Sequence, residues 1–164
     1  MNTLRKAVYN RIIPRTLLFI VVVILVLAIS IPGLASGGEV TRGKFHSFST
    51  GVERGYDITG QAHMTRTASG KTIVSVHASG LVSKTAYGVH VHNKACNDAN
   101  GGGHYQNLVG GAVDEYNEIW PLFTTNPAGN GNGKAKNDFY ARPEAQAVVI
   151  HDTDGARIAC ADLE

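Results

Sequence analysis

After Ala35 the sequence consists of short β-type segments and shows no helical period. β-branched residues recur within these segments and Gly separates them, a pattern typical of strands joined by tight turns. Gly60–Thr67 and Lys71–His77 flank the short Gly-containing turn Ala68–Gly70, which predicts a hairpin. Further strands are expected at Ala86–His92, Ile119–Thr124, Gly133–Tyr140, Ala145–His151 and Arg157–Leu163. Seven or eight short strands predict an all-β sandwich or flattened barrel.

Four histidines are placed as metal ligands would be. His90 and His92 alternate along a predicted strand, so both rings point to the same side, about 7 Å apart. His104 follows the loop Gly101–Gly103, and His151 ends a later predicted strand. A ligand set made only of nitrogens suits copper, zinc, iron or nickel, and a tetragonal set of four imidazoles with an open face suits copper. Copper is therefore the expected metal.

Four motifs surround these histidines in a fixed order. They are Gly88-Val-His-Val-His92, Gly103-His104, Val148-Val-Ile-His151 and Gly155-Ala-Arg-Ile-Ala-Cys160. Their order resembles that of the copper/zinc superoxide dismutases, over roughly Thr72 to Leu163. The resemblance implies a Greek-key β-barrel and an enzyme that converts superoxide to oxygen and hydrogen peroxide. It also implies that His90, His92, His104 and His151 bind copper.

The same resemblance implies roles for further residues. Arg157 corresponds to the arginine that guides the anion to copper, a task that its planar donor fork suits better than Lys would. His104 is the expected proton carrier. Cys96 and Cys160 correspond to the intrasubunit disulfide. Independently, they are the only two cysteines of the chain, and such a pair in an exported domain predicts a disulfide.

The zinc ligands of the typical family member have no counterpart. The family's zinc site needs two more His and an Asp after the bridging histidine, yet no His occurs between His104 and His151. The remaining His46, His63 and His77 lie upstream on predicted strands, where we expect surface or barrel-face residues. The family's long charged loop before the arginine is also missing. Both features resemble the copper-only branch of the family, so we expect copper without zinc.

Without zinc, another group must orient the ring of His104. Metal-bound imidazoles almost always donate their other N–H to a carboxylate or carbonyl. The segment Asp114–Glu118 lies where the zinc loop would return to the barrel, and Glu115 resembles the carboxylate that copper-only members use. Glu115 is our first candidate and Glu118 the second, although acidic loop residues are usually solvated.

The first 35 residues predict export. Four basic residues precede an apolar stretch over residues 17–35, and Gly33 and Ala35 fit a signal peptidase that cleaves before Ser36. Alternatively this stretch of 19 residues stays uncleaved, because about 20 apolar residues span a bilayer as a helix. We expect a signal peptide or an N-terminal membrane anchor, with the following domain secreted, periplasmic or otherwise extracytoplasmic.

The charge of the remaining chain excludes one class of partner. Residues 1–35 hold four of the 15 basic residues and none of the 13 acidic ones, so the rest is slightly acidic. Nothing in it suggests the basic face of a nucleic-acid binder. We expect a short linker and the first strand region at residues 36–55, and one superoxide dismutase-like β-barrel domain at residues 56–164.

Two other functions fit the same sequence. A secreted copper-binding or copper-delivery module would keep the fold and the four ligands without turnover, although Arg157 argues against it because a storage site needs no anion guide. In a disulfide-linked β-sandwich used for adhesion, the histidines would have no functional role. The dismutase is the first hypothesis and the copper-binding module is the alternative.

Overall fold

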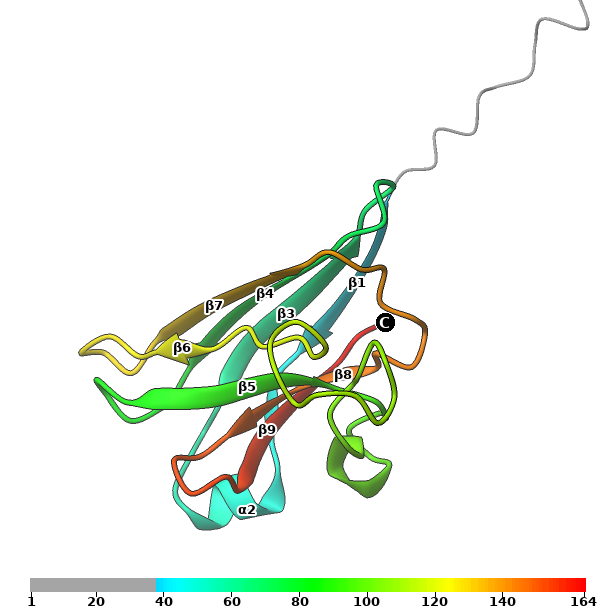
Figure 1. The fold of residues 1–164 in the computed structure, drawn as a ribbon. Coiled ribbons are helices and arrows are strands. Elements are labelled where there is room, and N and C mark those ends of the chain that lie inside the picture. The colour runs from blue at the N-terminus through cyan, green and yellow to red at the C-terminus, as the bar shows by residue number, and fades with distance from the viewer. Residues whose placement is uncertain (1–37) are drawn as a thin grey trace, which may run out of the picture. The chain divides into compact units, whose positions relative to one another are not determined.

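The computed structural model describes residues 38–164, which form two antiparallel sheets (Figure 1). The strands are β1 (Glu39–Lys44), β2 (His46–Ser47), β3 (Thr59–Arg66), β4 (Thr72–Ser79), β5 (Ala86–His92), β6 (Phe123–Thr124), β7 (Gly131–Asn137), β8 (Ala147–His151) and β9 (Arg157–Asp162). The first sheet has the order β1-β3-β4-β7, and the second has the order β2-β9-β8-β5-β6. The helix α2 (Ser49–Glu53) and the 3-10 helix η1 (Ala99–Gly101) lie in connections.

The expected fold class is confirmed, since the domain is all-β with the two-sheet arrangement of a Greek-key barrel. The predicted hairpin is β3–β4, paired from Thr59 opposite Ser79 to Arg66 opposite Thr72. The strand expected at 119–124 forms ladder pairs only at Phe123–Thr124. The helix α2 was not expected, because five residues are too few to show a helical period.

The chain passes from one sheet to the other near its start. β1 pairs with β3 in the first sheet, whereas β2 pairs with β9 in the second. Phe45 lies between the two strands and is 5% exposed, so it is buried in the core at the bend. In the segment expected to hold a linker and the first strand, the chain from Glu39 onward thus forms β1, β2 and α2.

The main hydrophobic core lies between the two sheets. Val74 and Val76 of β4 are buried on the inner face, while Ser75 and His77 are exposed on the outer face. Val148 and Ile150 of β8 contribute from the second sheet. Burying each such aliphatic side chain contributes about 1.5–3 kcal/mol, which makes the core the main source of a rigid frame.

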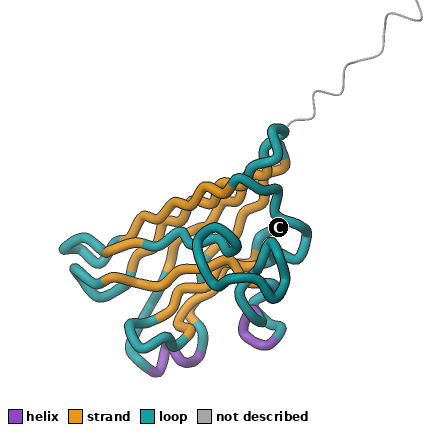
Figure 2. Tube along the Cα trace, viewed as in Figure 1, coloured by secondary structure: helices purple, strands orange, loops and turns teal. Residues whose placement is uncertain are grey.

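A smaller apolar cluster covers the outer face of the second sheet. It contains Ala147 and Val149 of β8 together with Cys96 and Cys160, and Phe48 packs against it. Figure 2 shows the long loops that gather in front of these strands. The outer face of the second sheet is therefore not open to solvent along its whole length, and the histidines lie on this covered face.

The predicted signal peptide or membrane anchor lies outside the described residues. Among residues 38–164, no helix has the length and apolar character needed to cross a membrane. Export and anchoring stay predictions from the sequence.

Candidate metal centre

β5 supplies two of the four histidines because its side chains alternate between two faces. Tyr87, Val89 and Val91 point into the main core, where each is at most 2% exposed. His90 and His92 therefore point to the opposite face of the second sheet. His92 is fully buried there and His90 is partly buried.

The loop after β5 brings His104 back beside His92. The two residues pair in an isolated antiparallel bridge, and the backbone N–H of Asn93 donates to the carbonyl oxygen of Gly103 at 2.9 Å. Gly101 permits this close return. Its φ is +89°, and a Cβ at this position would lie 3.0 Å from Cγ2 of Val149.

β8 supplies the fourth histidine. It lies next to β5 in the sheet, and His151 at its end is opposite Gly88. The ladder between β8 and β9 is irregular between Ile150 and His151, and Arg157 is the partner of His151 on β9. Two neighbouring strands and one loop thus bring the histidines together.

The four histidines form one compact group. One nitrogen from each ring lies within 4.8 Å of the corresponding nitrogens of the others. The ring centroids of His90 and His104 are 4.1 Å apart, and the Nε2 atoms of His92 and His151 are 3.1 Å apart. Within residues 38–164, this is the one group of three or more His, Cys, Asp or Glu side chains whose ligand atoms come so close.

Hydrogen bonds determine which nitrogen of each ring is free. Nδ1 of His92 donates to the carbonyl oxygen of Gly102 at 3.3 Å, and Nδ1 of His151 donates to that of Gly155 at 3.0 Å. Both rings therefore present an unprotonated Nε2 to the group. Facing lone pairs 3.1 Å apart repel each other unless a cation lies between them, so the pair fits a metal ion.

His90 has a buried nitrogen without a hydrogen-bond partner, namely Nδ1. A buried polar atom without a partner costs about 1–3 kcal/mol, so such atoms are rare unless a ligand satisfies them. The unpaired Nδ1 is a second observation that fits a bound metal.

Burial keeps these imidazoles neutral. It is the largest cause that lowers the pKa of His90 to about 3, followed by the charges of His104 and His151. Burial also lowers the pKa of His92 to about 3 and lowers the pKa of His151. The three rings are unprotonated at pH 7, which is the form that binds metal.

Glu118 is the carboxylate beside His104. Its Oε2 lies 2.6 Å from Nδ1 of His104 and accepts a second hydrogen bond from the indole N–H of Trp120, at 2.8 Å. Its Oε1 accepts from Nε2 of Gln106 at 3.1 Å. Burial opposes ionisation of Glu118, but these three hydrogen bonds outweigh it and lower the pKa of the carboxyl group. His104 consequently keeps its Nδ1 proton, and its Nε2 is free for the group.

Glu115, the first candidate from the sequence, lies elsewhere. Its side chain is exposed, and its backbone carbonyl accepts a hydrogen bond from Nδ2 of Asn137. The structure therefore places the second candidate, Glu118, beside the ring. Trp120 and Gln106 were not identified from the sequence, because neither belongs to a recognisable motif. The one signal for Trp120 was its position two residues after a candidate carboxylate.

Arg157 lies beside the histidine group. Its Nη1 donates to the carbonyl oxygens of Ala99 and Asn100, at 3.1 and 3.0 Å. Burial is the largest cause that lowers the pKa of His92 and of His151, and the positive charge of Arg157 is a smaller cause in both. Arg157 therefore lies within electrostatic reach of both rings. Arg157 as a residue is partly exposed.

The disulfide joins the loop after β5 to β9. Cys96 and Cys160 are bonded, and the backbone N–H of Cys96 also donates to the carboxylate of Asp162 at 2.7 Å. The loop that carries the hydrogen-bond acceptors of Arg157 is therefore fixed to the strand that carries Arg157.

The other three histidines lie apart from this group. His46 is on β2, His63 on β3 and His77 on β4. His46 and His77 are exposed, and Nδ1 of His77 is 2.9 Å from Oδ1 of Asn132. None of the three is a member of the four-histidine group.

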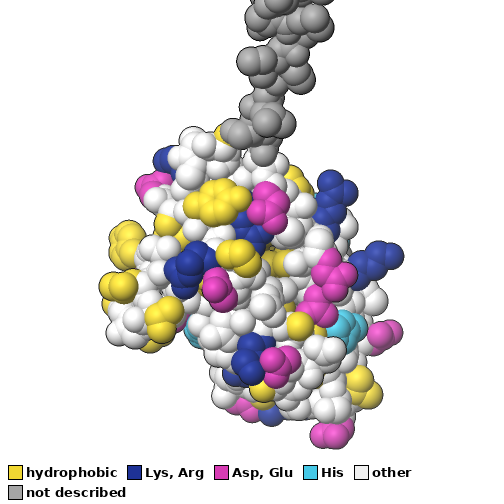
Figure 3. Space-filling view, turned by 90° about the vertical axis from the view of Figure 1, so that its right-hand side faces the viewer, with side chains coloured by type: hydrophobic (Ala, Val, Ile, Leu, Met, Phe, Trp, Pro, Cys, Tyr) yellow, Lys and Arg dark blue, Asp and Glu magenta, His cyan; other side chains and the backbone are white. Residues whose placement is uncertain are grey.

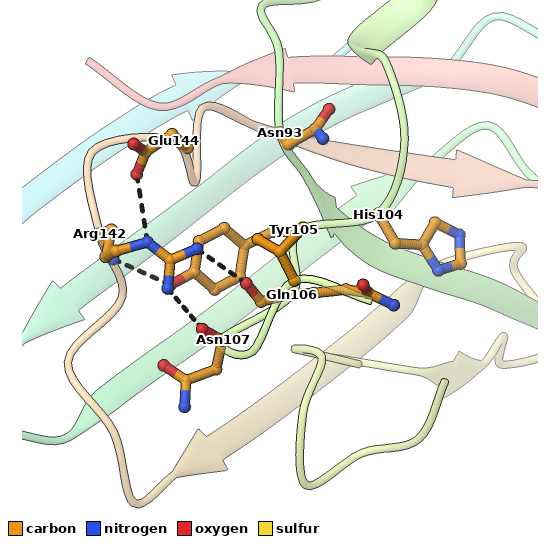
Figure 4. Close-up of a pocket in the computed structure, with 8 residues that line it drawn as sticks. Asn93, His104, Tyr105, Gln106, Asn107, Arg142 and Glu144 are labelled. Atoms are coloured by element: carbon orange, nitrogen blue, oxygen red, sulfur yellow. Dashed lines mark hydrogen bonds and ion pairs between the residues drawn. The ribbon is translucent and has the colours of Figure 1, made fainter. Parts of the chain in front are cut away.

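A separate cavity of about 360 Å³ adjoins His104. Arg142 lies across it from His104, and the His104 ring points away from Arg142 (Figure 4). The guanidinium donates to the carbonyl oxygens of Gln106 and Asn107 and stacks over Tyr105, 5.2 Å from the ring centroid. Its donors are thus engaged by the protein itself.

The surface carries charges of both signs. In the view of Figure 3, basic and acidic side chains are interspersed, with scattered hydrophobic side chains between them. The most exposed large hydrophobic residues lie on the connection between His104 and β6, and they are Leu108, Val109, Val113 and Tyr116.

A scan against models of known protein families finds no match for this chain, and a search of curated proteins finds none either. The chain is similar to solved structures. Superoxide dismutase 5 of Candida albicans in its Cu(II) form matches with a TM-score of 0.55 and 21% identity, over 77% of this chain and 91% of that one. A glutamate-to-glutamine variant of the same protein matches with a TM-score of 0.54 and 19% identity, over 77% and 91%.

These similarities identify the fold. A glutamate-to-alanine variant of the Candida albicans protein matches with a TM-score of 0.51 and 19% identity, over 77% of this chain and 88% of that one. The described domain therefore has the superoxide dismutase fold. The resemblance seen in the motifs is confirmed at the level of the fold, and the chain carries a four-histidine group of the kind that binds a metal ion.

Proposed function

We propose that this protein is an exported, copper-dependent superoxide dismutase that works without a zinc site. The observation that carries the proposal is the convergence of four imidazoles on one point, with the guanidinium of Arg157 in electrostatic reach. The similarity to a superoxide dismutase solved in its Cu(II) form supports it.

The donor atoms favour copper. They are Nδ1 of His90 and Nε2 of His92, His104 and His151, and a ligand set made only of imidazole nitrogens suits copper far better than calcium or magnesium. The unpaired Nδ1 of His90 and the facing Nε2 atoms of His92 and His151 fit such an ion. No carboxylate or thiolate competes within the group.

Bound copper would supply the redox chemistry, accepting an electron from one superoxide and returning it to a second, so that two superoxide ions and two protons give oxygen and hydrogen peroxide. Arg157 attracts the anion and holds it by charge-assisted hydrogen bonds. Its Nη1 is anchored on the carbonyls of Ala99 and Asn100, which keeps the guanidinium beside the histidines.

His104 and Glu118 handle the proton. Glu118 holds the proton on Nδ1 of His104, so Nε2 of that ring is the atom that would bind copper and, when it is not bound to copper, would take up a proton and pass it to the product. Trp120 and Gln106 donate to the same carboxylate and fix its orientation. A carboxylate thereby takes the orienting role that zinc has in the typical family member.

The disulfide supports export. Such bonds persist in oxidising compartments and are rare in the cytosol. Together with the predicted signal peptide or anchor, it favours an extracytoplasmic protein, held at a membrane only if residues 17–35 stay uncleaved.

The test is metal content measured together with turnover. The full chain is loaded with Cu(II), its copper and zinc are counted, and its rate of superoxide loss is compared with His151→Ala and with the matched control His77→Ala. We expect one copper per chain, no requirement for zinc, and activity that is lost only in His151→Ala. Full copper occupancy without turnover would instead support the copper-binding module, and no stoichiometric copper binding would leave only the scaffold.

A further inference from the structure

The short connection between β8 and β9 joins two residues of the site. It spans residues 152–156, directly after His151 and directly before Arg157. The carbonyl of Gly155 accepts the Nδ1 proton of His151 at 3.0 Å, so the conformation of the turn determines how this ring is oriented. Gly155 has a φ of +86°, a conformation that side-chain-bearing residues rarely adopt.

One side chain from outside the turn binds two of its carboxylates. Arg54 follows α2, and its Nη1 donates to Oδ2 of Asp152 at 2.8 Å. Its Nη1 and Nη2 also donate to the two oxygens of Asp154, at 3.0 and 2.8 Å. Bidentate guanidinium–carboxylate contacts fix orientation as well as distance.

The backbone segment that precedes Arg54 is itself held against β9. The backbone N–H of Phe48 donates to the carbonyl oxygen of Ile158 at 2.9 Å. Gly51 of α2 lies so close that a Cβ there would be 2.2 Å from the same oxygen. Arg54 thus extends from a helix held on the strand that begins with Arg157, and Figure 1 shows α2 at the same end of the domain as the β8–β9 turn.

A second contact joins the same two segments. The hydroxyl of Tyr56 donates to Oδ1 of Asp152 at 3.0 Å, and the side chain of Asp152 is 12% exposed. Within the turn, the N–H of Thr153 donates to Oδ1 of Asp152, and the N–H of Ala156 donates to Oδ1 of Asp154. The carboxylates that bind Arg54 are therefore the ones that shape the turn.

We propose that Arg54 is a positioning residue for the metal centre, acting through Asp152 and Asp154 on the Gly155 carbonyl that orients His151 and on the backbone that places Arg157. The role in turnover rests on the proposed function, whereas the orientation of His151 does not. Arg54 contacts neither the four histidines nor the space between them.

The experiment measures the Nδ1–H signal of His151 in the metal-free, oxidised full chain. Long-range ¹H–¹⁵N correlation spectra report the Nδ1–H of His151, and the Nδ1–H of His104, held by Glu118, serves as an internal reference. In Arg54→Gln we expect the His151 signal to be lost to solvent exchange while the His104 signal persists. Arg54→Lys should restore it in part, because Lys keeps the charge but cannot form the fork.

The matched control is Arg42→Gln, which removes the same charge from an exposed residue on β1. Asp154→Asn provides a milder variant, since it weakens the bidentate contact and leaves Asp152 available to Arg54. In the copper-loaded chain, we expect turnover per bound copper to fall roughly tenfold in Arg54→Gln, because small misplacements of binding groups cost one to two orders of magnitude.

An unchanged His151 signal in both Arg54→Gln and Asp154→Asn would overturn the proposal. Loss of the His151 and His104 signals together would also overturn it, because it would show a general effect on folding. If copper-loaded wild-type protein has no dismutase activity, the proposed function fails, yet the His151 signal still decides whether Arg54 orients the ring.

Discussion

Nδ1 of His104 lies 2.6 Å from Oε2 of Glu118, whose side chain is 1% exposed. A buried carboxylate with three donors orients an imidazole far more firmly than a solvated loop acid would. The contact explains how this fold can hold His104 in place without a second metal.

Replacing Glu118 by Gln should therefore impair the site. Gln has one acceptor oxygen for the donors of His104, Trp120 and Gln106, so the ring of His104 loses its fixed orientation. We expect activity per chain to fall by roughly 10-fold to 100-fold, the range seen when partners of metal ligands are removed. Steady-state rates at known copper content provide the measurement. Glu115→Gln is the matched control, and equal activity of the two variants would contradict this role.

The single Trp of the chain should report copper binding. The ring centroids of Trp120 and His90 are 5.6 Å apart, so Cu(II) in the histidine group would quench the indole emission. Titration of the metal-free protein should give quenching that saturates at one equivalent. His151→Ala should weaken binding, and His77→Ala should not. Quenching that is identical in all three proteins would place the copper elsewhere.

Acid should destabilise the metal-free protein at mildly acidic pH. The pKa of His90 and of His92 falls to about 3 on folding, from an ordinary value of 6.5, so the unfolded chain binds more protons between these values. Stability is then fully present above pH 6.5 and is lost as the pH falls toward 3, by at most about 1.4 kcal/mol per pH unit for each ring.

Urea unfolding between pH 7 and pH 5 tests this, because carboxylates remain ionised in that window. His92→Gln should flatten the dependence, and His77→Gln should leave it as it is. A stability that is constant from pH 7 to pH 5 in the parent protein would contradict the neutral, buried state of these rings.

Arg157 should set the rate of anion capture. In Arg157→Ala we expect kcat/KM to fall roughly tenfold or more and to lose part of its dependence on ionic strength, because steering by charge raises encounter rates by one to three orders of magnitude. Copper affinity should change little. Arg157→Lys should be intermediate, and Arg42→Ala is the matched control. Unaltered rates and salt dependence in Arg157→Ala would remove the guide role.

Removing the disulfide should affect both stability and the site. In Cys96→Ala/Cys160→Ala we expect a loss of about 2–5 kcal/mol in the free energy of unfolding. The loop with Ala99 and Asn100 would no longer be tied to β9, so Arg157 loses its anchored position. Denaturant curves with and without reductant measure this loss of stability. Reductant should destabilise the parent protein and should leave the variant unchanged. Equal stability of the variant and the oxidised parent would oppose this account.

The strands and the shared face of His90 and His92 could be predicted from the sequence because both depend on local patterns. Alternation along β5 separates Val89 and Val91 from His90 and His92 whatever the rest of the chain does. The motifs around His104 and His151 then supplied the other two rings through the family resemblance. The short helix α2 left no such pattern.

The sequence could not show which carboxylate contacts His104, because this depends on how a loop packs. Ile119 is 0% exposed, and its carbonyl accepts a hydrogen bond from the N–H of Val91. These contacts place the preceding residue, Glu118, beside His104 and leave Glu115 in solvent. No periodicity encodes such a contact. The pairing of Arg54 with Asp152 and Asp154 is likewise a tertiary feature between residues about 100 positions apart.

The most direct test is a crystal structure of the copper-loaded protein with anomalous diffraction measured at the copper edge. We predict one peak per chain, bonded to Nδ1 of His90 and to Nε2 of His92, His104 and His151. Such a peak would be absent from His151→Ala or markedly weaker in it. A peak at any other position, or none in crystals grown with excess copper, would contradict the binding of one ion by these four rings.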